Sequence, residues 1–166
     1  MTILWPTAIL GAAIILQTTI FSRITMIQGT VDIVLLCFLA WILRRNAPGS
    51  WYWGLLAGLA VGFSSELPVW LPIAGYLIVT IGIQTLKTRI WQVPLFSLFT
   101  TTFLATILLL GLQWIFLALS GSPIDINSAF NLVVLPSVVL NLIAAFPVYT
   151  FIGEIYQFIY PEVEEA

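Results

Sequence analysis

The sequence predicts an all-α polytopic membrane protein, a bundle of about six transmembrane helices that forms a single domain over residues 1–166. Composition is the first reason, because 61% of the residues are hydrophobic and only 7% are charged, whereas about a quarter are charged in an ordinary soluble domain. Length is the second reason, since a spanning helix needs about 20 apolar residues and six such helices leave no room for a soluble domain. The apolar runs also lack the sustained alternation of a membrane β-barrel.

Six apolar runs, separated by short polar segments, mark the predicted helices. They cover approximately residues 5–21, 27–43, 51–64, 69–86, 94–119 and 129–159. The first run has no basic region before it, so we expect a retained helix rather than a cleaved signal peptide. Pro48 and Gly49 mark a turn after the second run. The last run is too long for one straight span, and Pro136 and Pro147 within it predict kinks or a break.

The basic residues predict that both termini lie in the cytoplasm. Four of the five follow the second and fourth predicted helices, on the side that also holds both termini. These four are Arg44, Arg45, Lys87 and Arg89, whereas Arg23 falls on the opposite side. Cytoplasmic loops of membrane proteins carry the excess of positive charge, so this distribution orients the bundle. The tryptophans fall near predicted helix ends, where they are expected at headgroup level, and they include Trp5, Trp41, Trp51, Trp53, Trp70 and Trp91.

The residues available for chemistry are few. The chain has no histidine, which removes the commonest general base and metal ligand, and its one cysteine, Cys37, cannot pair within the chain. We therefore expect no catalytic site, no metal site and no cofactor. The net charge of −2 argues against nucleic acid as a partner, because no basic face is available to neutralise phosphates.

Two acidic residues near predicted outer helix ends are candidates for polar contacts. Asp32 stands at the start of the second predicted helix, where an acid can accept hydrogen bonds from free N–H groups and favour the helix dipole. The alternative is that Asp32 contacts a neighbouring helix or a partner. Glu66 lies in the tight turn after the third helix. Glu154 is expected near the cytoplasmic interface, and it would be a functional candidate if it lay deep in the membrane.

Small residues at a spacing of four predict where helices approach closely. Gly54, Gly58 and Gly62 form two successive G-x-x-x-G steps on one face of the third predicted helix. Ala8 and Ala12 form a smaller version on the first helix. This pattern predicts a packing seam, with another helix of the chain as the favoured neighbour and a partner protein as the alternative.

Amide side chains within the predicted spans predict hydrogen bonds between helices, a commoner role than binding substrate. They are Gln17, Gln84, Gln113, Asn131 and Asn141.

Four segments, in order along the chain, resemble the MreD family of bacterial rod shape-determining proteins. Gly29–Leu36 resembles the opening of that family's second helix, with Val31 where proline is common, and 54–63 resembles its glycine-rich third helix. The start of its fourth helix resembles 71–76, and its closing proline and asparagine pattern resembles 136–149. The family often places an aspartate soon after the third-helix glycines. Here the run is Ser-Ser-Glu, so either Glu66 takes that place or the region has diverged.

The resemblance implies a non-enzymatic membrane scaffold of the cell-elongation machinery, which sets cell shape and directs peptidoglycan synthesis. Such a scaffold lies in the bacterial inner membrane, binds an MreC-type bitopic protein, and links MreB filaments to peptidoglycan synthases.

The alternative is a substrate-binding S-component of an energy-coupling-factor vitamin transporter. MreD-like proteins resemble S-components, which are also six-helix bundles of this size. Ala8 and Ala12 would then face the coupling subunit. Against this alternative, the outer loops offer few groups to hold a vitamin, chiefly Asp32, Glu66, Asp125 and Asn127.

Overall fold

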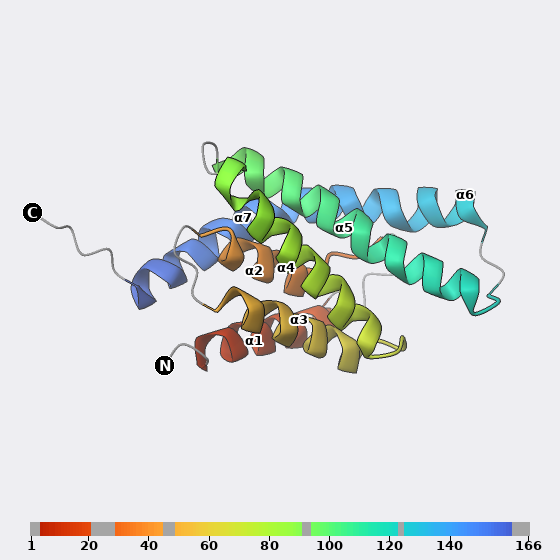
Figure 1. Ribbon diagram of the computed structural model, residues 1–166, viewed down its shortest axis with the longest axis horizontal. Coiled ribbons are helices and arrows are strands. Elements are labelled where there is room, and N and C mark those ends of the chain that lie inside the picture. Colours follow the sequence, from red (N-terminus) through yellow and green to blue (C-terminus); the bar gives the residue numbers. More distant parts are fainter. Residues whose placement is uncertain (1–3, 21–28, 45–48, 91–93, 123–124, 161–166) are drawn as a thin grey trace, which may run out of the picture.

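The computed structural model describes residues 4–20, 29–44, 49–90, 94–122 and 125–160, and within these ranges the chain is helical and contains no strand (Figure 1). The helices are α1 (Leu4–Ile20), α2 (Ile33–Ile42), α3 (Ser50–Ser64), α4 (Trp70–Ile90), α5 (Pro94–Leu119), α6 (Ile126–Ala129) and α7 (Leu135–Ile159), with a π-helical turn, η2 (Phe130–Val134), between the last two. The expected all-α fold is therefore confirmed for the described residues. Among them, two helical stretches, Pro94–Leu119 and Asn127–Ile159, are long and apolar enough to cross a membrane.

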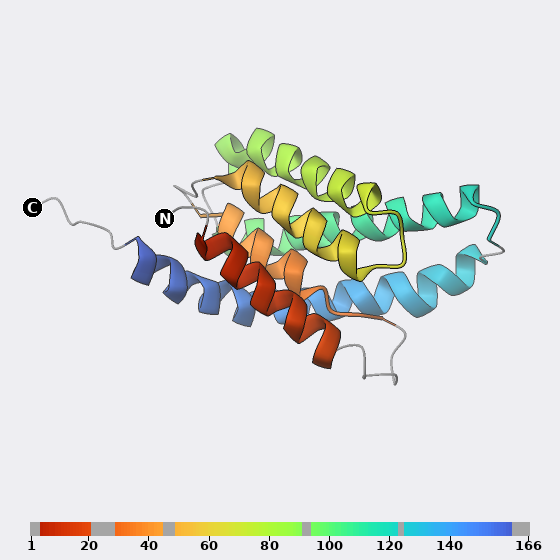
Figure 2. The same ribbon diagram turned by 90° about the horizontal axis from the view of Figure 1, so that it is seen from below.

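The long helices run in alternating directions, so one end of the bundle holds the start of α1 and the ends of α2, α4 and α7 (Figures 1 and 2). Arg44 follows α2 there, and Lys87 and Arg89 lie in the last turns of α4. We call this end the basic end. Arg23 and Arg45, which the orientation argument also used, lie outside the described residues.

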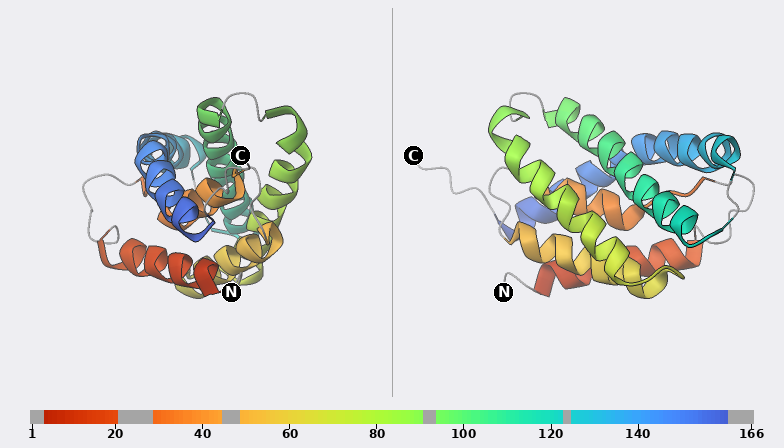
Figure 3. Two further views of the ribbon diagram at one scale, coloured as in Figure 1. Left: turned by 90° about the vertical axis from the view of Figure 1, so that its left-hand side faces the viewer. Right: turned by 45° about the vertical axis from the view of Figure 1, so that its right-hand side comes forward.

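Helix α2 occupies the centre of the bundle, inside a ring formed by the other long helices (Figure 3). Nine of its ten residues, from Val34 to Ile42, are buried. This agrees with its composition, because a helix that is apolar on every face must be kept from water, and here the neighbouring helices cover it.

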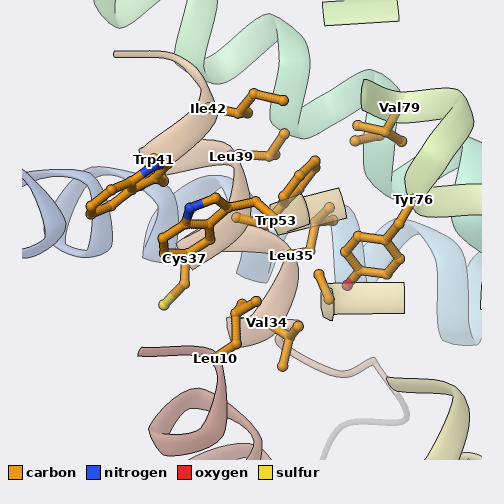
Figure 4. Close-up of a cluster of buried hydrophobic side chains, with 14 of the residues drawn as sticks. Leu10, Val34, Leu35, Cys37, Leu39, Trp41, Ile42, Trp53, Tyr76 and Val79 are labelled. Atoms are coloured by element: carbon orange, nitrogen blue, oxygen red, sulfur yellow. The ribbon is translucent and has the colours of Figure 1, made fainter. Parts of the chain in front are cut away.

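Two tryptophans expected at headgroup level lie instead in this core. Trp41 of α2 and Trp53 of α3 are at most 1% exposed and stack with ring centroids 4.4 Å apart (Figure 4). The expectation was wrong for these two because it considered nearness to a helix end and not which face of the helix the ring occupies. Trp5, Trp51 and Trp70 are exposed, and Trp91 lies outside the described residues.

The second helix is shorter than the expected range 27–43. It covers Ile33–Ile42, and residues 29–32 are not helical, while residues 27 and 28 lie outside the described residues. We call residues 29–32 the lead-in segment. Ten helical residues rise only about 15 Å, half of the roughly 30 Å hydrocarbon core of a bilayer.

The last helical stretch contains two prolines, Pro136 and Pro147, and accommodates each differently. Pro136 has no N–H for the carbonyl four residues earlier, and its ring crowds that carbonyl. The turn just before it is widened, with Leu135 N–H donating to Phe130 O five residues back. Pro147 lies within α7, which stays helical through it, and the rod from α6 to α7 changes direction along its length (Figure 1). The expected break is thus a π-helical turn.

Candidate functional site

The lead-in segment is bound to α7, more than a hundred residues later in the sequence. Thr30 N–H donates to Ser137 Oγ at 3.0 Å, and Asp32 N–H donates to Asn141 Oδ1 at 2.8 Å. A Cβ at Gly29 would lie 2.6 Å from Pro136 Cβ and 2.7 Å from the Ser137 nitrogen, so only glycine permits this approach. The bonds satisfy backbone groups that have no helical partner.

Asp32 caps α2 and also contacts a neighbouring helix. Its Oδ1 accepts a hydrogen bond from Leu35 N–H at 2.9 Å, the geometry of an N-cap acid. The hydroxyl of Tyr76, on α4, lies 3.4 and 3.3 Å from its two carboxylate oxygens. Val34 N–H donates to Gln17 Oε1 on α1 at 3.1 Å, so the first turn of α2 is satisfied from both sides. Asp32 therefore both caps α2 and contacts a neighbouring helix, the two roles that the sequence left as alternatives.

Asn141 joins three helices. It is 1% exposed, accepts the lead-in hydrogen bond through Oδ1, and donates through Nδ2 to Thr106 Oγ1 of α5 at 3.1 Å. A buried amide is costly unless it is paired, and here both its oxygen and its nitrogen are paired. Asn141 thereby fixes α7 against both α5 and the start of α2.

A cavity of about 430 Å³ opens beside these residues. It lies toward the end of the bundle opposite the basic end, since it is lined by the last turns of α1 and α3 and by the segment that begins α2. Its lining is unusually polar for so apolar a chain. The polar side chains include Gln17, Asp32, Ser64, Thr106, Gln113 and Asn141.

The sequence predicted several of these amides as links between helices but did not predict that they share one cavity. Gln17 lies near the end of α1, and Asp32 begins α2. Because consecutive helices alternate in direction, such positions meet at one end of the bundle. The alternating helix directions could have predicted this shared position. The prediction was missed because the non-helical lead-in segment was expected to be part of the second helix.

The three glycines of the third predicted helix face α4 of the same chain. A Cβ at Gly58 would lie 2.7 Å from Ile73 Cα, and one at Gly62 would lie 3.0 Å from Val69 Cγ1. Gly54 lies against the Thr80 side chain. This seam is therefore an internal contact, and its surface is covered.

The remaining candidate residues do not line the cavity and are exposed. Ala8 and Ala12 are exposed on α1, and Glu66 is exposed in the connection between α3 and α4. Glu154 is also exposed, in the final turns of α7 near the basic end. None of these four lines the cavity that contains Asp32.

At the basic end, Arg44 is fixed on the surface of α7. Its Nη2 donates to Tyr149 O at 2.9 Å, and its guanidinium carbon lies 4.3 Å from the centroid of the Tyr149 ring. Gly153 lies directly against this guanidinium, where a larger residue would displace it.

Among the described residues, no group of three or more His, Cys, Asp or Glu side chains could hold a metal ion. No family model matches the chain, and no curated protein and no solved structure matches it. The geometry around Asp32 and the exposed faces of the helices are therefore the observations on which a functional proposal rests.

Proposed function

We propose that the chain is a multi-pass protein of the bacterial inner membrane, with six spans. Its exposed surface supports this proposal, because large apolar side chains are exposed on α1, α3, α4, α5 and α7. They include Ile15 (64% exposed), Phe63 (78%), Ile81 (48%), Phe96 (69%) and Ile143 (69%). Such a surface suits lipid, whereas soluble monomers rarely expose contiguous apolar patches beyond a few hundred Å².

The short α2 fits this proposal when the lead-in segment is counted with it. The four non-helical residues can add at most about 13 Å to the roughly 15 Å of α2, which brings the second span close to the hydrocarbon thickness. Irregular backbone is tolerated at that depth only where protein covers it or where it lines a cavity. Gly29 and Val31 of the lead-in segment are buried, and Thr30, Val31 and Asp32 line the cavity.

We propose that the basic end, and with it both termini, faces the cytoplasm, following the distribution of positive charge. A periplasm-active reporter and a cytoplasm-active reporter, each fused after Ala166, test this orientation. Activity of the periplasmic reporter alone would reverse it.

Within the membrane we propose a non-enzymatic scaffold of the MreD type. It binds an MreC-type bitopic protein and connects MreB filaments with peptidoglycan synthases in the elongation machinery. One observation carries this proposal: two segments of the MreD-like pattern, 29–36 and 136–149, contact each other in space. The bonds from Thr30 to Ser137 and from Asp32 to Asn141 join them, so the pattern corresponds to one structural unit.

The exposed small residues of α1 are the surface we propose for the bitopic partner. Small side chains let two helix backbones approach closely in lipid, where packing and not hydrophobicity drives association. Ala8 and Ala12 present such a face, whereas the glycine seam is already covered by α4.

Affinity purification in mild detergent tests the scaffold role. We expect the wild-type chain to recover an MreC-type protein, and Ala8→Leu/Ala12→Leu to recover much less. The matched control is Ala118→Leu, which enlarges an exposed alanine on α5. Equal recovery by all three chains would remove α1 as the docking face, and recovery of an ATPase-bound coupling subunit instead of an MreC-type protein would overturn the scaffold proposal.

The transporter S-component remains the second candidate because the cavity favours it. The outer loops alone offered few groups to hold a small molecule, but the structure gathers polar side chains from four helices around Asp32. The same purification separates the two functions, since a solute-binding component is recovered with its coupling subunit and a scaffold with its bitopic partner.

A further inference from the structure

We propose that the cavity around Asp32 binds a small ligand that carries a protonated amine. The inference concerns a binding site and does not rest on the scaffold role, because either a scaffold or a solute-binding component can contain such a site.

The charge of the lining favours a cationic ligand. Among the lining residues that the structure describes, Asp32 is the single acidic one, and none is a lysine or an arginine. Arg44 lies at the opposite end of α2. A phosphate, sulfate or carboxylate group would therefore meet one negative charge and no positive charge from these residues. An ammonium group would supply the missing counter-charge, in surroundings where charges attract more strongly than in water.

One of the contacts at Asp32 is loose enough to be exchanged for a stronger donor. Leu35 N–H donates at 2.9 Å, and Gln17 and Val34 N–H also interact with the carboxylate. Tyr76 approaches at 3.3–3.4 Å, longer than the roughly 2.5–2.7 Å of a strong hydroxyl–carboxylate bond. A stronger donor in the cavity can replace the loose contact with Tyr76.

The rest of the lining suits the other atoms of such a ligand. An ammonium group has three N–H donors, and oxygen acceptors from Ser64, Thr106 and Gln113 lie around the same cavity. Apolar walls from Ile14 and Leu110 can cover a carbon skeleton. The volume of about 430 Å³ lies within the range of about 300–1,000 Å³ that small-molecule sites occupy.

Two sources can supply this chemistry, a soluble organic amine or the ethanolamine headgroup of a membrane lipid. Both present a primary ammonium on a short carbon chain. The experiment therefore has one arm for the charge of the ligand and one for its source.

The first arm measures binding of three probes of similar shape to the purified protein by calorimetry near neutral pH. The probes are cyclohexylamine, cyclohexanol and cyclohexanecarboxylate. We expect binding of the amine alone. In Asp32→Asn we expect affinity for the amine to fall about tenfold or more, because a charge-assisted hydrogen bond is lost. Asparagine keeps the N-cap, so the bundle should still fold.

The matched control is Glu66→Gln, which removes an exposed acid outside the cavity and should leave the affinity unchanged. If Asp32→Asn does not fold, Gln113→Phe is measured instead. The phenylalanine ring introduced on α5 fills the cavity and leaves the first turn of α2 intact, so the affinity for the amine should fall in this variant. Equal binding of cyclohexanol, or unchanged amine affinity in the variant that folds, overturns the proposal.

The second arm identifies the source by native mass spectrometry of protein taken from bilayers of phosphatidylethanolamine and phosphatidylglycerol. Selective retention of the ethanolamine lipid, displaced by cyclohexylamine and lost in Asp32→Asn, supports the headgroup as the ligand. Amine binding that displaces no lipid supports a soluble amine. If neither amine binding nor lipid retention depends on Asp32, the site does not exist as proposed.

Discussion

Replacing Gly58 by alanine tests the seam between α3 and α4. The new Cβ would lie 2.7 Å from Ile73 Cα and 3.2 Å from Pro72 O. Both atoms belong to backbone, so no side chain can rotate away and the two helices must separate. Overpacking of this kind costs about 1–3 kcal/mol. The same substitution also gains about 1 kcal/mol of helix propensity, which offsets part of the cost.

Gly82→Ala in α4 is the matched control, because nothing lies within 4 Å of a Cβ at that position. It gains the helix propensity without the clash, so the difference between the two variants isolates the steric cost of about 1–3 kcal/mol. For a chain of this size that difference corresponds to a melting temperature about 2–12 °C lower for Gly58→Ala. Tryptophan fluorescence during heating in detergent measures it. Equal melting temperatures would show that α3 and α4 are not packed as described.

Three further predictions concern the core, the site and the connection before α6. Asn141→Ala should destabilise the bundle by about 1–3 kcal/mol, because it leaves two buried partners unpaired, and chemical unfolding in detergent measures the loss. Trp41→Ala should cost about 3–5 kcal/mol, since the ring is 1% exposed and stacked, whereas Trp51→Ala, at a ring 51% exposed, should cost much less; similar losses would contradict the core. Hydrogen bonds from the hydroxyl and the N–H of Ser128 hold the pKa of Asp125 below its usual value. Ser128→Ala should therefore raise this pKa, as seen by carboxyl NMR titration, and the local stabilisation, present above the unfolded-state pKa, should then be lost at a higher pH as the solution is acidified.

The sequence predicted the helical class well and the surroundings of individual residues less well. Length and apolar composition decide that a segment is helical, and α5 extends over the expected 94–119. The glycine spacing predicted a close contact, but a periodic pattern carries no information about which helix supplies the other half. Only the structure identifies α4.

The predicted start of α2 is too early because the predicted helix extends the apolar run through residues 27–32. Gly29, Thr30 and Asp32 are weak helix formers, and Asp32 suits an N-cap, so a local signal for a later start was present. The contact of Gly29 with Pro136 and the bonds to Ser137 and Asn141 further stabilise the non-helical backbone at 29–32. Those partners lie more than a hundred residues away, beyond the reach of any local pattern.

The position of α2 has a consequence for the order in which the protein is made. This helix is synthesised before α7, yet the N–H groups of its lead-in segment find their acceptors on α7, more than a hundred residues later. Until α7 has been made, these N–H groups lack their acceptors, and in the proposed membrane location each unsatisfied group is costly. A nascent chain interrupted before residue 136 therefore contains unpaired polar groups that quality-control proteases can distinguish from the finished bundle.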